Sequence, residues 1–405
     1  MHRVTVALLA LVMATPAWAG VWGAKSRSCP RLTARLSALE QRPDASPKRL
    51  QRLRERVADR CVALNEIQAL GSHNSYHVQP RPALLAALFG ISTVFEAWEY
   101  THLPLDQQFE TQGVRQIELD VFADPLGGLF SRRGGLVAIG EDPESGIPAL
   151  AAPGLKVLHI QDLDFEATCL TFVDCLETVK AWSDAHPRHL PIMILIEAKD
   201  DVIPDPYGYG FATPLPIDPV MLDTIDAEIR AVFPERQLLT PDRVRRGRAT
   251  LEEAVLELGW PRLGAVRGQV LFALDNGGGV RDDYIAGHPA LAGRVLFTDS
   301  APGTPEAAFA KRNNPSDATI PGLVAAGYVV RTRADGDTVE ARTGDTGPRD
   351  AALASGAQWV STDYPVENPA FGTGYAVQIP GGAPARCNPV AAPAGCRAAG
   401  LEPQP

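Results

Sequence analysis

Four apolar runs of the sequence end in side chains that can transfer protons or bind a metal ion. These side chains are His73 and Asn74 after the first run, Glu118 and Asp120 in the second, His159 after the third, and Glu197 and Lys199 in the fourth. Alternate residues of a strand point to the same face, so Glu118 would share a face with Asp120. One such ending is weak evidence for a site, whereas four in succession indicate that the four ends come together.

These residue types suit the cleavage of a phosphodiester. One imidazole, from His73 or His159, can take a proton from an attacking hydroxyl, and the other can give a proton to the leaving alkoxide. The phosphoryl charge also needs a cation beside it, because neutral imidazoles cannot supply one. One amide carbonyl and three carboxylates offer oxygen ligands, from Asn74, Glu118, Asp120 and Glu197. We expect this all-oxygen set to bind Ca²⁺, with Mg²⁺ as the alternative, because it suits either ion far better than zinc.

Strand-like and helix-like patterns alternate along most of the chain. The expected strands are 66–72, 114–121, 155–160, 191–197, 269–275, 294–298, 326–331 and 358–362. The expected helices include Leu103–Thr111, Thr171–Trp182, Pro219–Phe233, Leu251–Leu258 and Val339–Ala354. This alternation predicts an α/β fold, a (β/α)₈ TIM-type barrel, in which functional groups collect at the carboxyl ends of the strands. A doubly wound sheet is the alternative, although no glycine-rich phosphate-binding motif follows the first strand.

The two ends of the chain have a different composition from the expected barrel. Arg3, the apolar run from Val4 to Met13 and the triplet Ala17-Trp18-Ala19 predict a secretory signal peptide over residues 1–19. The apolar run is shorter than the ~20 residues that a membrane span needs, so we expect no transmembrane span. We assign 20–63 to a helical N-terminal extension, 64–370 to the barrel and 371–405 to a Pro/Ala-rich C-terminal tail. The protein would then be secreted or periplasmic.

Six cysteines lie in the expected mature chain: Cys29, Cys61, Cys169, Cys175, Cys387 and Cys396. An even number in an exported chain indicates disulfides. Among the fifteen possible connectivities, we expect the pairing of sequence neighbours, which are 29–61, 169–175 and 387–396.

Composition limits the class of partner. The chain has 405 residues, of which 45% are hydrophobic, so it can bury a sizeable core. Its formal charge of −10 and the absence of a Lys/Arg cluster argue against a nucleic-acid partner. We expect a monomer.

The order of the motifs resembles a known family. His-Asn, then Glu-x-Asp, then His and then Glu at successive strand ends is similar to the catalytic X-region of calcium-dependent phosphoinositide-specific phospholipase C, and most to its secreted bacterial branch. The resemblance covers about residues 64–370. Its motifs are Gly71-Ser-His-Asn-Ser-Tyr-His77, Glu118-Leu-Asp120, Leu158-His159, Glu197-Ala-Lys199, Val330-Arg-Thr-Arg-Ala-Asp335 and Val360-Ser-Thr-Asp-Tyr-Pro365.

The resemblance implies a role for each matched residue. It implies His73 and His159 as the acid/base pair, and Asn74, Glu118, Asp120 and Glu197 as calcium ligands. The implied reaction is attack of the inositol 2-hydroxyl on phosphorus at a membrane surface, which releases diacylglycerol and leaves an inositol cyclic phosphate. Lys199 and Arg331 are candidates for phosphate or head-group contacts, with a structural salt bridge as the open alternative for Arg331. Arg333, Asp335 and Tyr364 are further candidates for the head-group pocket.

Two other functions remain open at this point. A glycerophosphodiester phosphodiesterase or a sphingomyelinase-D-like phospholipase would also carry a Glu-x-Lys motif, which Lys199 fits. Such enzymes follow the first His with Arg, and this chain has Asn74 there. A barrel that binds lipid without catalysis is the alternative from a different class.

The stretch from Ala83 to Trp98 follows the first expected strand and is strongly apolar. It would lie on the catalytic side of a barrel. One hypothesis is that its Leu88, Phe89, Ile91, Phe95 and Trp98 enter a bilayer surface. The favoured interpretation is a helix that packs on the barrel or forms a pocket wall.

Overall fold

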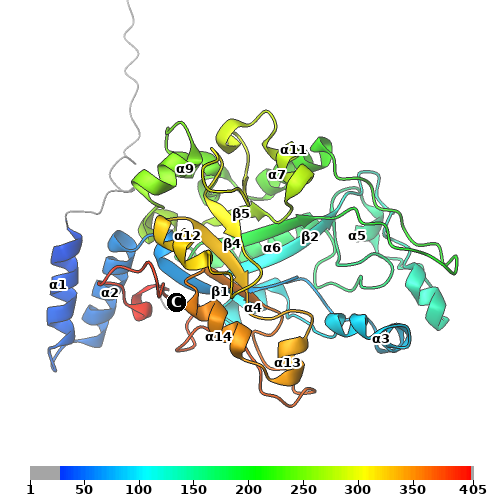
Figure 1. Cartoon of the computed structure of the whole chain (residues 1–405), viewed down its shortest axis with the longest axis horizontal. Helices are drawn as coiled ribbons and strands as arrows, with labels where there is room; N and C mark the ends of the chain where they lie inside the picture. The colour runs from blue at the N-terminus through cyan, green and yellow to red at the C-terminus, as the bar shows by residue number, and fades with distance from the viewer. Residues whose placement is uncertain (1–27, 403–405) are drawn as a thin grey trace, which may run out of the picture.

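The computed structural model describes residues 28–402 of the chain, and the predicted signal peptide lies outside these residues. Eight parallel strands follow one another in the order β6-β5-β4-β2-β1-β9-β8-β7. A parallel bridge between Asp299, just after β6, and Phe309 of β7 joins the two ends of this order. The sheet is therefore a nearly closed barrel of the TIM type, as the sequence predicts (Figure 1).

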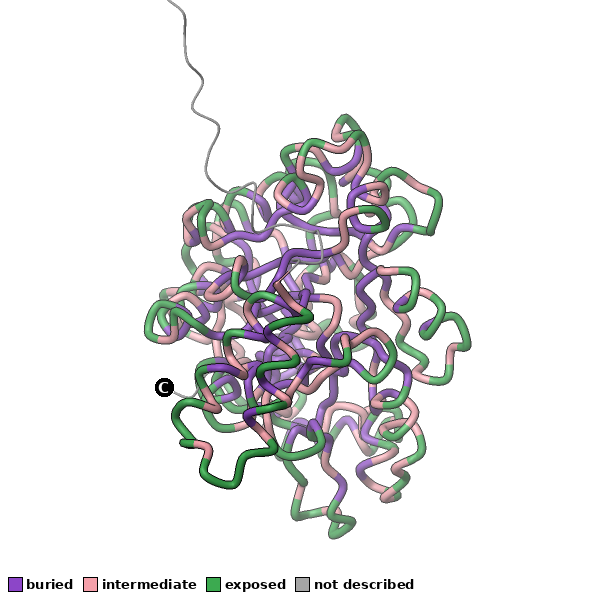
Figure 2. The backbone as a smooth tube through the Cα atoms, turned by 90° about the vertical axis from the view of Figure 1, so that its left-hand side faces the viewer, coloured by how far each residue is buried: buried purple, intermediate pink, exposed green. Residues whose placement is uncertain are grey.

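The barrel strands are β1 (Ile67–Ser72), β2 (Gln116–Phe122), β4 (Ile192–Ala198), β5 (Val270–Leu274), β6 (Leu296–Thr298), β7 (Phe309–Lys311), β8 (Val329–Arg333) and β9 (Trp359–Thr362). Strands buried on both faces are continuously apolar, as Ile192-Met-Ile-Leu-Ile196 in β4 shows. In Figure 2 buried segments run through the middle of the molecule, and exposed segments lie mainly at its periphery.

One expected strand is wrong and one barrel strand was missed. The segment predicted as a strand over 155–160 contains only β3 (Lys156–Val157), which pairs antiparallel with β2 and is not a barrel strand. The barrel takes β7 in its place. The reason is length, because three residues are too few to show a strand pattern in the sequence.

Helices cover the outside of the barrel. The α-helices of the barrel region are α3 (Pro82–Phe89), α4 (Leu105–Thr111), α5 (Pro148–Ala151), α6 (Phe172–Ala185), α7 (Pro219–Val232), α8 (Pro241–Arg245), α9 (Leu251–Glu253), α10 (Leu263–Val266), α11 (Gly278–Ile285), α12 (Ile320–Ala326), α13 (Val339–Thr343) and α14 (Gly347–Ala354). Shorter turns are η1 (Leu64–Glu66), η2 (Thr93–Trp98), η3 (Gly134–Ile139), η4 (Glu235–Gln237), the π-turn η5 (Ala254–Leu258), η6 (Pro289–Leu291) and η7 (Ala398–Gly400). The helix expected over Val339–Ala354 is two helices, because Gly344 takes a left-handed conformation that ends α13.

Two helices precede the barrel, α1 (Cys29–Glu40) and α2 (Pro47–Cys61). Their leucines and Val57 form a small core of their own. At the other end of the chain, β10 (Ala385–Cys387) pairs antiparallel with β1, and η7 packs on α2. The last part of the described chain therefore lies beside α2 and β1 (Figure 1).

Three disulfides form among the described residues: Cys29–Cys61, Cys169–Cys175 and Cys387–Cys396. These are the pairs of sequence neighbours, so the predicted connectivity is confirmed. Within 28–402, no helix combines the length and the apolar character that crossing a membrane requires.

Candidate active site

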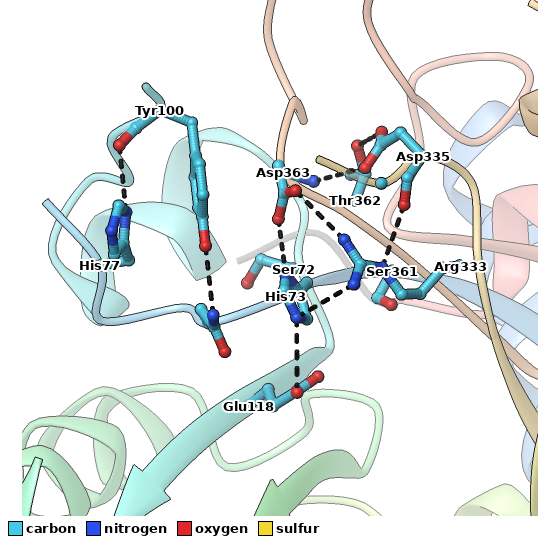
Figure 3. Close-up of polar contacts among 12 residues, drawn as sticks. Ser72, His73, His77, Tyr100, Glu118, Arg333, Asp335, Ser361, Thr362 and Asp363 are labelled. Carbon is cyan, nitrogen blue, oxygen red and sulfur yellow. Dashed lines mark hydrogen bonds and ion pairs between the residues drawn. The ribbon is translucent and has the colours of Figure 1, made fainter. Parts of the chain in front are cut away.

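His73 and Asp363 lie side by side because the strands before them are paired. Ser72 of β1 is the register partner of Thr362 of β9, and the next residue of each strand is His73 and Asp363. Nδ1 of His73 lies 2.7 Å from Oδ1 of Asp363. Figure 3 shows the imidazole between the carboxylates of Asp363 and Glu118. The Asp363 side chain is buried, whereas that of His73 is 17% exposed, so the carboxylate stands behind a ring that solvent can reach.

Arg333, at the end of β8, fixes the proton positions on this ring. One guanidinium nitrogen lies 3.2 Å from Nε2 of His73, and another lies 3.2 Å from Oδ2 of Asp363. A guanidinium can only donate, so Nε2 accepts and Nδ1 carries the proton that is donated to Asp363. Burial and the charge of Arg333 lower the pKa of His73 to about 3, against the opposing effect of Asp363. His73 is therefore neutral near pH 7, with a lone pair on Nε2.

Glu118 of β2 faces His73 from the other side (Figure 3). Its Oε1 lies 3.7 Å from Nε2 of His73, and its Oε2 lies 2.5 Å from a guanidinium nitrogen of Arg331. Arg331 is itself buried and also donates to Asn313 at 2.5 Å. Burial raises the pKa of Glu118 to about 7, although the charge of Arg331 opposes the rise.

Glu118, Asp120 and Glu197 form a trio of carboxylates. Asp120 of β2 and Glu197 of β4 are register partners, and Glu118 precedes Asp120 on the same face. One oxygen from each carboxylate can be chosen so that all three lie within 4.8 Å of one another. Burial and the charge of Glu197 raise the pKa of Asp120 well above its usual range.

Several oxygens near this trio lack a hydrogen-bond donor. Oδ1 of Asp120 and Oδ1 of Asn74 are buried without a hydrogen-bond partner, and Oδ2 of Asp120 accepts no well-formed hydrogen bond, although the ammonium of Lys199 lies 3.4 Å away. Asn74 adopts a left-handed conformation (φ 42°), and its amide nitrogen donates to Tyr100. Buried oxygens without donors are unusual, and a hard divalent cation would satisfy them. The residues present therefore fit a Ca²⁺ or Mg²⁺ ion.

Lys199 lies next to the trio. Its ammonium is 3.4 Å from Oδ2 of Asp120 and 3.7 Å from Oε1 of Glu197. Burial would lower the pKa of Lys199, but the charges of these two carboxylates outweigh that effect and raise it. Lys199 is therefore a cation at the edge of the carboxylate trio.

His159 lies on the loop after β3, not at the end of a barrel strand as expected. Its Nδ1 lies 2.7 Å from Oδ2 of Asp164, and its side chain is 19% exposed. Asp164 is fully buried and also contacts Nε2 of His77. The two candidate catalytic histidines thus share one arrangement, in which a buried aspartate holds Nδ1 of a ring that solvent reaches.

The remaining predicted substrate residues differ in position. Arg333 touches His73, as described above. Asp335 lies behind Arg333 (Figure 3), where its oxygens accept hydrogen bonds from the backbone of Asp363 and from the hydroxyls of Thr362 and Tyr375. Tyr364 is buried, and its hydroxyl donates to the carbonyl of Glu99. The polar atoms of Asp335 and Tyr364 are therefore directed toward the protein.

Three residues of this arrangement, Asp363, Asp164 and His77, are not among the predicted site residues. Asp363 ends a strand within the motif Val360-Ser-Thr-Asp-Tyr-Pro365, so its position could have indicated it. Asp164 lies in a tight turn, where Ile160 and Asp164 exchange backbone hydrogen bonds, and no strand pattern points to it.

The apolar stretch after β1 is partly buried. Leu84 and Leu88 of α3 form a cluster with Leu136 and Phe165, against which Phe95 and Trp98 pack. Ile91 and Val94 are 71% and 65% exposed. Of the five side chains that the bilayer hypothesis names, Ile91 is therefore strongly exposed, and Leu88 is not available.

Residues 62–389 match the family described as "Phosphoinositide phospholipase C, Ca2+-dependent". A search among curated proteins gives no significant match.

Solved structures of phospholipases C are distantly similar to the chain. A calcium-dependent phosphoinositol-specific phospholipase C from a Pseudomonas species (apo form, myoinositol complex) is 17% identical over 80% of this chain and 95% of its own, with a TM-score of 0.46. A Ca²⁺-dependent phosphatidylinositol-specific phospholipase C from Streptomyces antibioticus is 19% identical over 77% and 97%, with a TM-score of 0.47. These structural likenesses are too weak to assign a family. The assignment to a family therefore rests on the family match over residues 62–389.

Proposed function

The chain belongs to the Ca²⁺-dependent phosphoinositide phospholipase C family, a family of phosphodiesterases, and from this we propose that it cleaves phosphatidylinositol-type lipids. The products would be diacylglycerol and an inositol cyclic phosphate, which the enzyme could then hydrolyse. The observation that carries the proposal is the pair of imidazoles, each held at Nδ1 by a buried aspartate, together with the carboxylate trio beside His73.

His73 is the general base in this proposal. Its neutral ring presents the lone pair of Nε2, which accepts a hydrogen bond from the guanidinium of Arg333 when no substrate is bound. The inositol 2-hydroxyl would replace Arg333 as the donor and lose its proton to Nε2 as its oxygen attacks phosphorus. The guanidinium of Arg333 would then be free to contact a phosphate oxygen. Asp363 would stabilise the imidazolium that forms.

His159 is the general acid. As the bond from phosphorus to the glycerol oxygen breaks, its Nε2 would give a proton to the leaving alkoxide. Asp164 would hold the ring through Nδ1, which leaves Nε2 to carry this proton. The two histidines would exchange roles if the cyclic product is hydrolysed.

Asn74, Glu118, Asp120 and Glu197 would hold the Ca²⁺ ion. When bound, the ion supplies positive charge to the phosphoryl oxygens in the transition state. Lys199, beside Asp120 and Glu197, is the second proposed contact for the phosphate or head group. Arg331 would act on Glu118 through their buried ion pair, and Asp335 and Tyr364 would support the residues around Asp363.

The exposed apolar residues indicate how the enzyme reaches a lipid. Eleven of the thirteen exposed large hydrophobic residues in 28–402 lie before or at the start of α4, α6, α7 or α14, or directly after β9, in segments that follow the carboxyl ends of barrel strands. They are Ile91, Val94, Leu103, Leu126, Val137, Val202, Tyr207, Leu215, Val220, Val339 and Val366. The catalytic residues lie at the same end of the barrel, so we propose that this face rests on the membrane, with the protein as a monomer.

The three disulfides support export to an oxidising compartment, outside the cell or in the periplasm.

The function is tested with vesicles that present phosphatidylinositol, phosphatidylcholine or phosphatidylethanolamine, by measuring diacylglycerol release with Ca²⁺ and with EGTA. We expect diacylglycerol to be released only from phosphatidylinositol, and only when Ca²⁺ is present. Formation of phosphatidic acid would favour a sphingomyelinase-D-like reaction, and binding without turnover would favour a lipid-binding barrel.

A further inference from the structure

We propose that His77 is a positioning residue for His159, on which it acts by donating a hydrogen bond to their shared partner Asp164. This inference rests on the proposed role of His159 as the general acid. The ring of His77 is fully buried, so His77 is not exposed to solvent.

Both ring nitrogens of His77 lie against hydrogen-bond acceptors. Its Nδ1 lies 3.1 Å from the carbonyl oxygen of Tyr100, which can only accept. Its Nε2 lies 2.9 Å from both oxygens of Asp164. The His77 ring also stacks on Tyr100 at 4.1 Å between centroids. Figure 3 shows the His77 ring held beside Tyr100.

Asp164 depends on these donors. It is fully buried, and Oδ2 accepts from Nδ1 of His159 at 2.7 Å as well as from His77. Burial would raise the pKa of Asp164, but the charges and hydrogen bonds of His77 and His159 outweigh that effect and lower it. Without the donor on His77, the buried carboxylate would be free to rotate away from His159 or would remain partly unsatisfied.

His159 has few other restraints. Its ring meets His77 edge-on at 5.7 Å and Trp98 at 6.0 Å between centroids, and within residues 28–402 Asp164 is its one hydrogen-bond partner. Because the loop that carries His159 is outside the barrel, the orientation of the ring depends on Asp164. His77, which follows β1, therefore links the position of the general acid to the strand that carries His73.

Two conservative substitutions separate the contacts of His77. In His77→Gln the side-chain amide nitrogen can take the place of Nε2 and donate to Asp164. In His77→Asn the amide nitrogen can take the place of Nδ1 and donate to Tyr100, while the donor to Asp164 is lost. If Asp164 carries the effect, His77→Asn should lower kcat about 10- to 100-fold with KM unchanged, and His77→Gln should recover most of this loss.

The leaving group reports whether the effect passes through His159. A 4-nitrophenyl ester of inositol phosphate has a leaving group that needs little protonation, so a defect in the general acid should matter less. We expect the kcat loss of His77→Asn, like that of His159→Ala, to be at least tenfold smaller on this ester than on phosphatidylinositol in mixed micelles. Thermal unfolding and Ca²⁺ titration of each variant identify variants that have simply failed to fold.

The outcomes decide the proposal. Equal losses in His77→Asn and His77→Gln, or the same loss on both substrates in a folded variant, would show that His77 only fills space. A wild-type rate for His77→Asn would also overturn it. If His159→Ala itself proves indifferent to the leaving group, the proposed role of His159 as the acid fails first, and the inference about His77 fails with it.

Discussion

Oδ1 of Asp363 lies 2.7 Å from Nδ1 of His73. Asp363, which follows β9, therefore holds the proposed general base His73, which follows β1. The contact exists because β1 and β9 are paired in register up to Ser72 and Thr362. An imidazole held in this way keeps its proton on Nδ1 and its lone pair on Nε2. The same arrangement at His159 and Asp164 is built from a loop and a tight turn.

Asp363→Asn should lower kcat by about 10²- to 10⁴-fold with little change in KM, because an amide lacks the charge that stabilises imidazolium and can hold the wrong tautomer. Steady-state kinetics on phosphatidylinositol in mixed micelles measures this effect. Asp226→Asn is the control, since Asp226 is a buried carboxylate of α7 that accepts a hydrogen bond from the hydroxyl of Tyr284. Similar losses in both variants would mean that the effect of Asp363 is one of stability.

Asp120→Asn should raise the Ca²⁺ concentration needed for half-maximal activity by about tenfold or more, because it removes charge from a proposed ligand whose buried Oδ1 has no hydrogen-bond partner. Activity measured in calcium buffers gives this value, and high Ca²⁺ should restore part of the rate. Asp201→Asn is the matched control on an exposed position beyond β4. An unchanged calcium requirement in Asp120→Asn would remove Asp120 from the ligand set.

Ca²⁺ affinity should fall as the pH decreases from 8 to 6. Burial raises the pKa of Glu118 to about 7 and also raises that of Asp120, so protons compete with the ion in this range. Binding must displace these protons, because only the carboxylate form is a ligand. Calorimetry at pH 6.5 in buffers with different ionisation enthalpies should show proton release, and less of it in Glu118→Gln. Binding without proton release would contradict these assignments.

Replacing Ile91 and Val94 together by serine should weaken vesicle binding and vesicle hydrolysis by about tenfold or more, because two aliphatic side chains no longer enter the bilayer. Hydrolysis of a water-soluble inositol phosphodiester should be unchanged. Leu256→Ser with Val390→Ser is the control, since these residues are 46% and 41% exposed outside the proposed membrane face. A similar loss on the soluble substrate would exclude a role in membrane contact.

The parts of the site that the sequence predicted are those carried by long strands. The ends of β1, β2 and β4 were predicted within about two residues, because continuous apolar runs identify parallel strands, and His73, Glu118, Asp120 and Glu197 lie on or directly after them. The run Leu155-Lys-Val-Leu158 has the same apolar character, yet β3 pairs antiparallel with β2 and is not a barrel strand. Lys156 is buried there and donates to the carbonyls of Ala152 and Gly154.

The rest of the site depends on tertiary contacts. His77 and Asp164 are 87 positions apart, and only the fold brings the two side chains together. The sequence left two roles for Arg331, a substrate contact or a structural salt bridge. Its buried ion pair with Glu118 supports the salt bridge. Ile91 and Phe95 belong to one apolar stretch, but the packing of α3 decided which of them is exposed.

Phosphorus NMR of the products formed from phosphatidylinositol vesicles tests the central claim most directly. We predict that an inositol cyclic phosphate appears first in the presence of Ca²⁺, that EGTA prevents it, and that His73→Ala and His159→Ala each lose it. Formation of an acyclic product with no cyclic intermediate, or cyclic phosphate formed equally well with EGTA, would contradict the account.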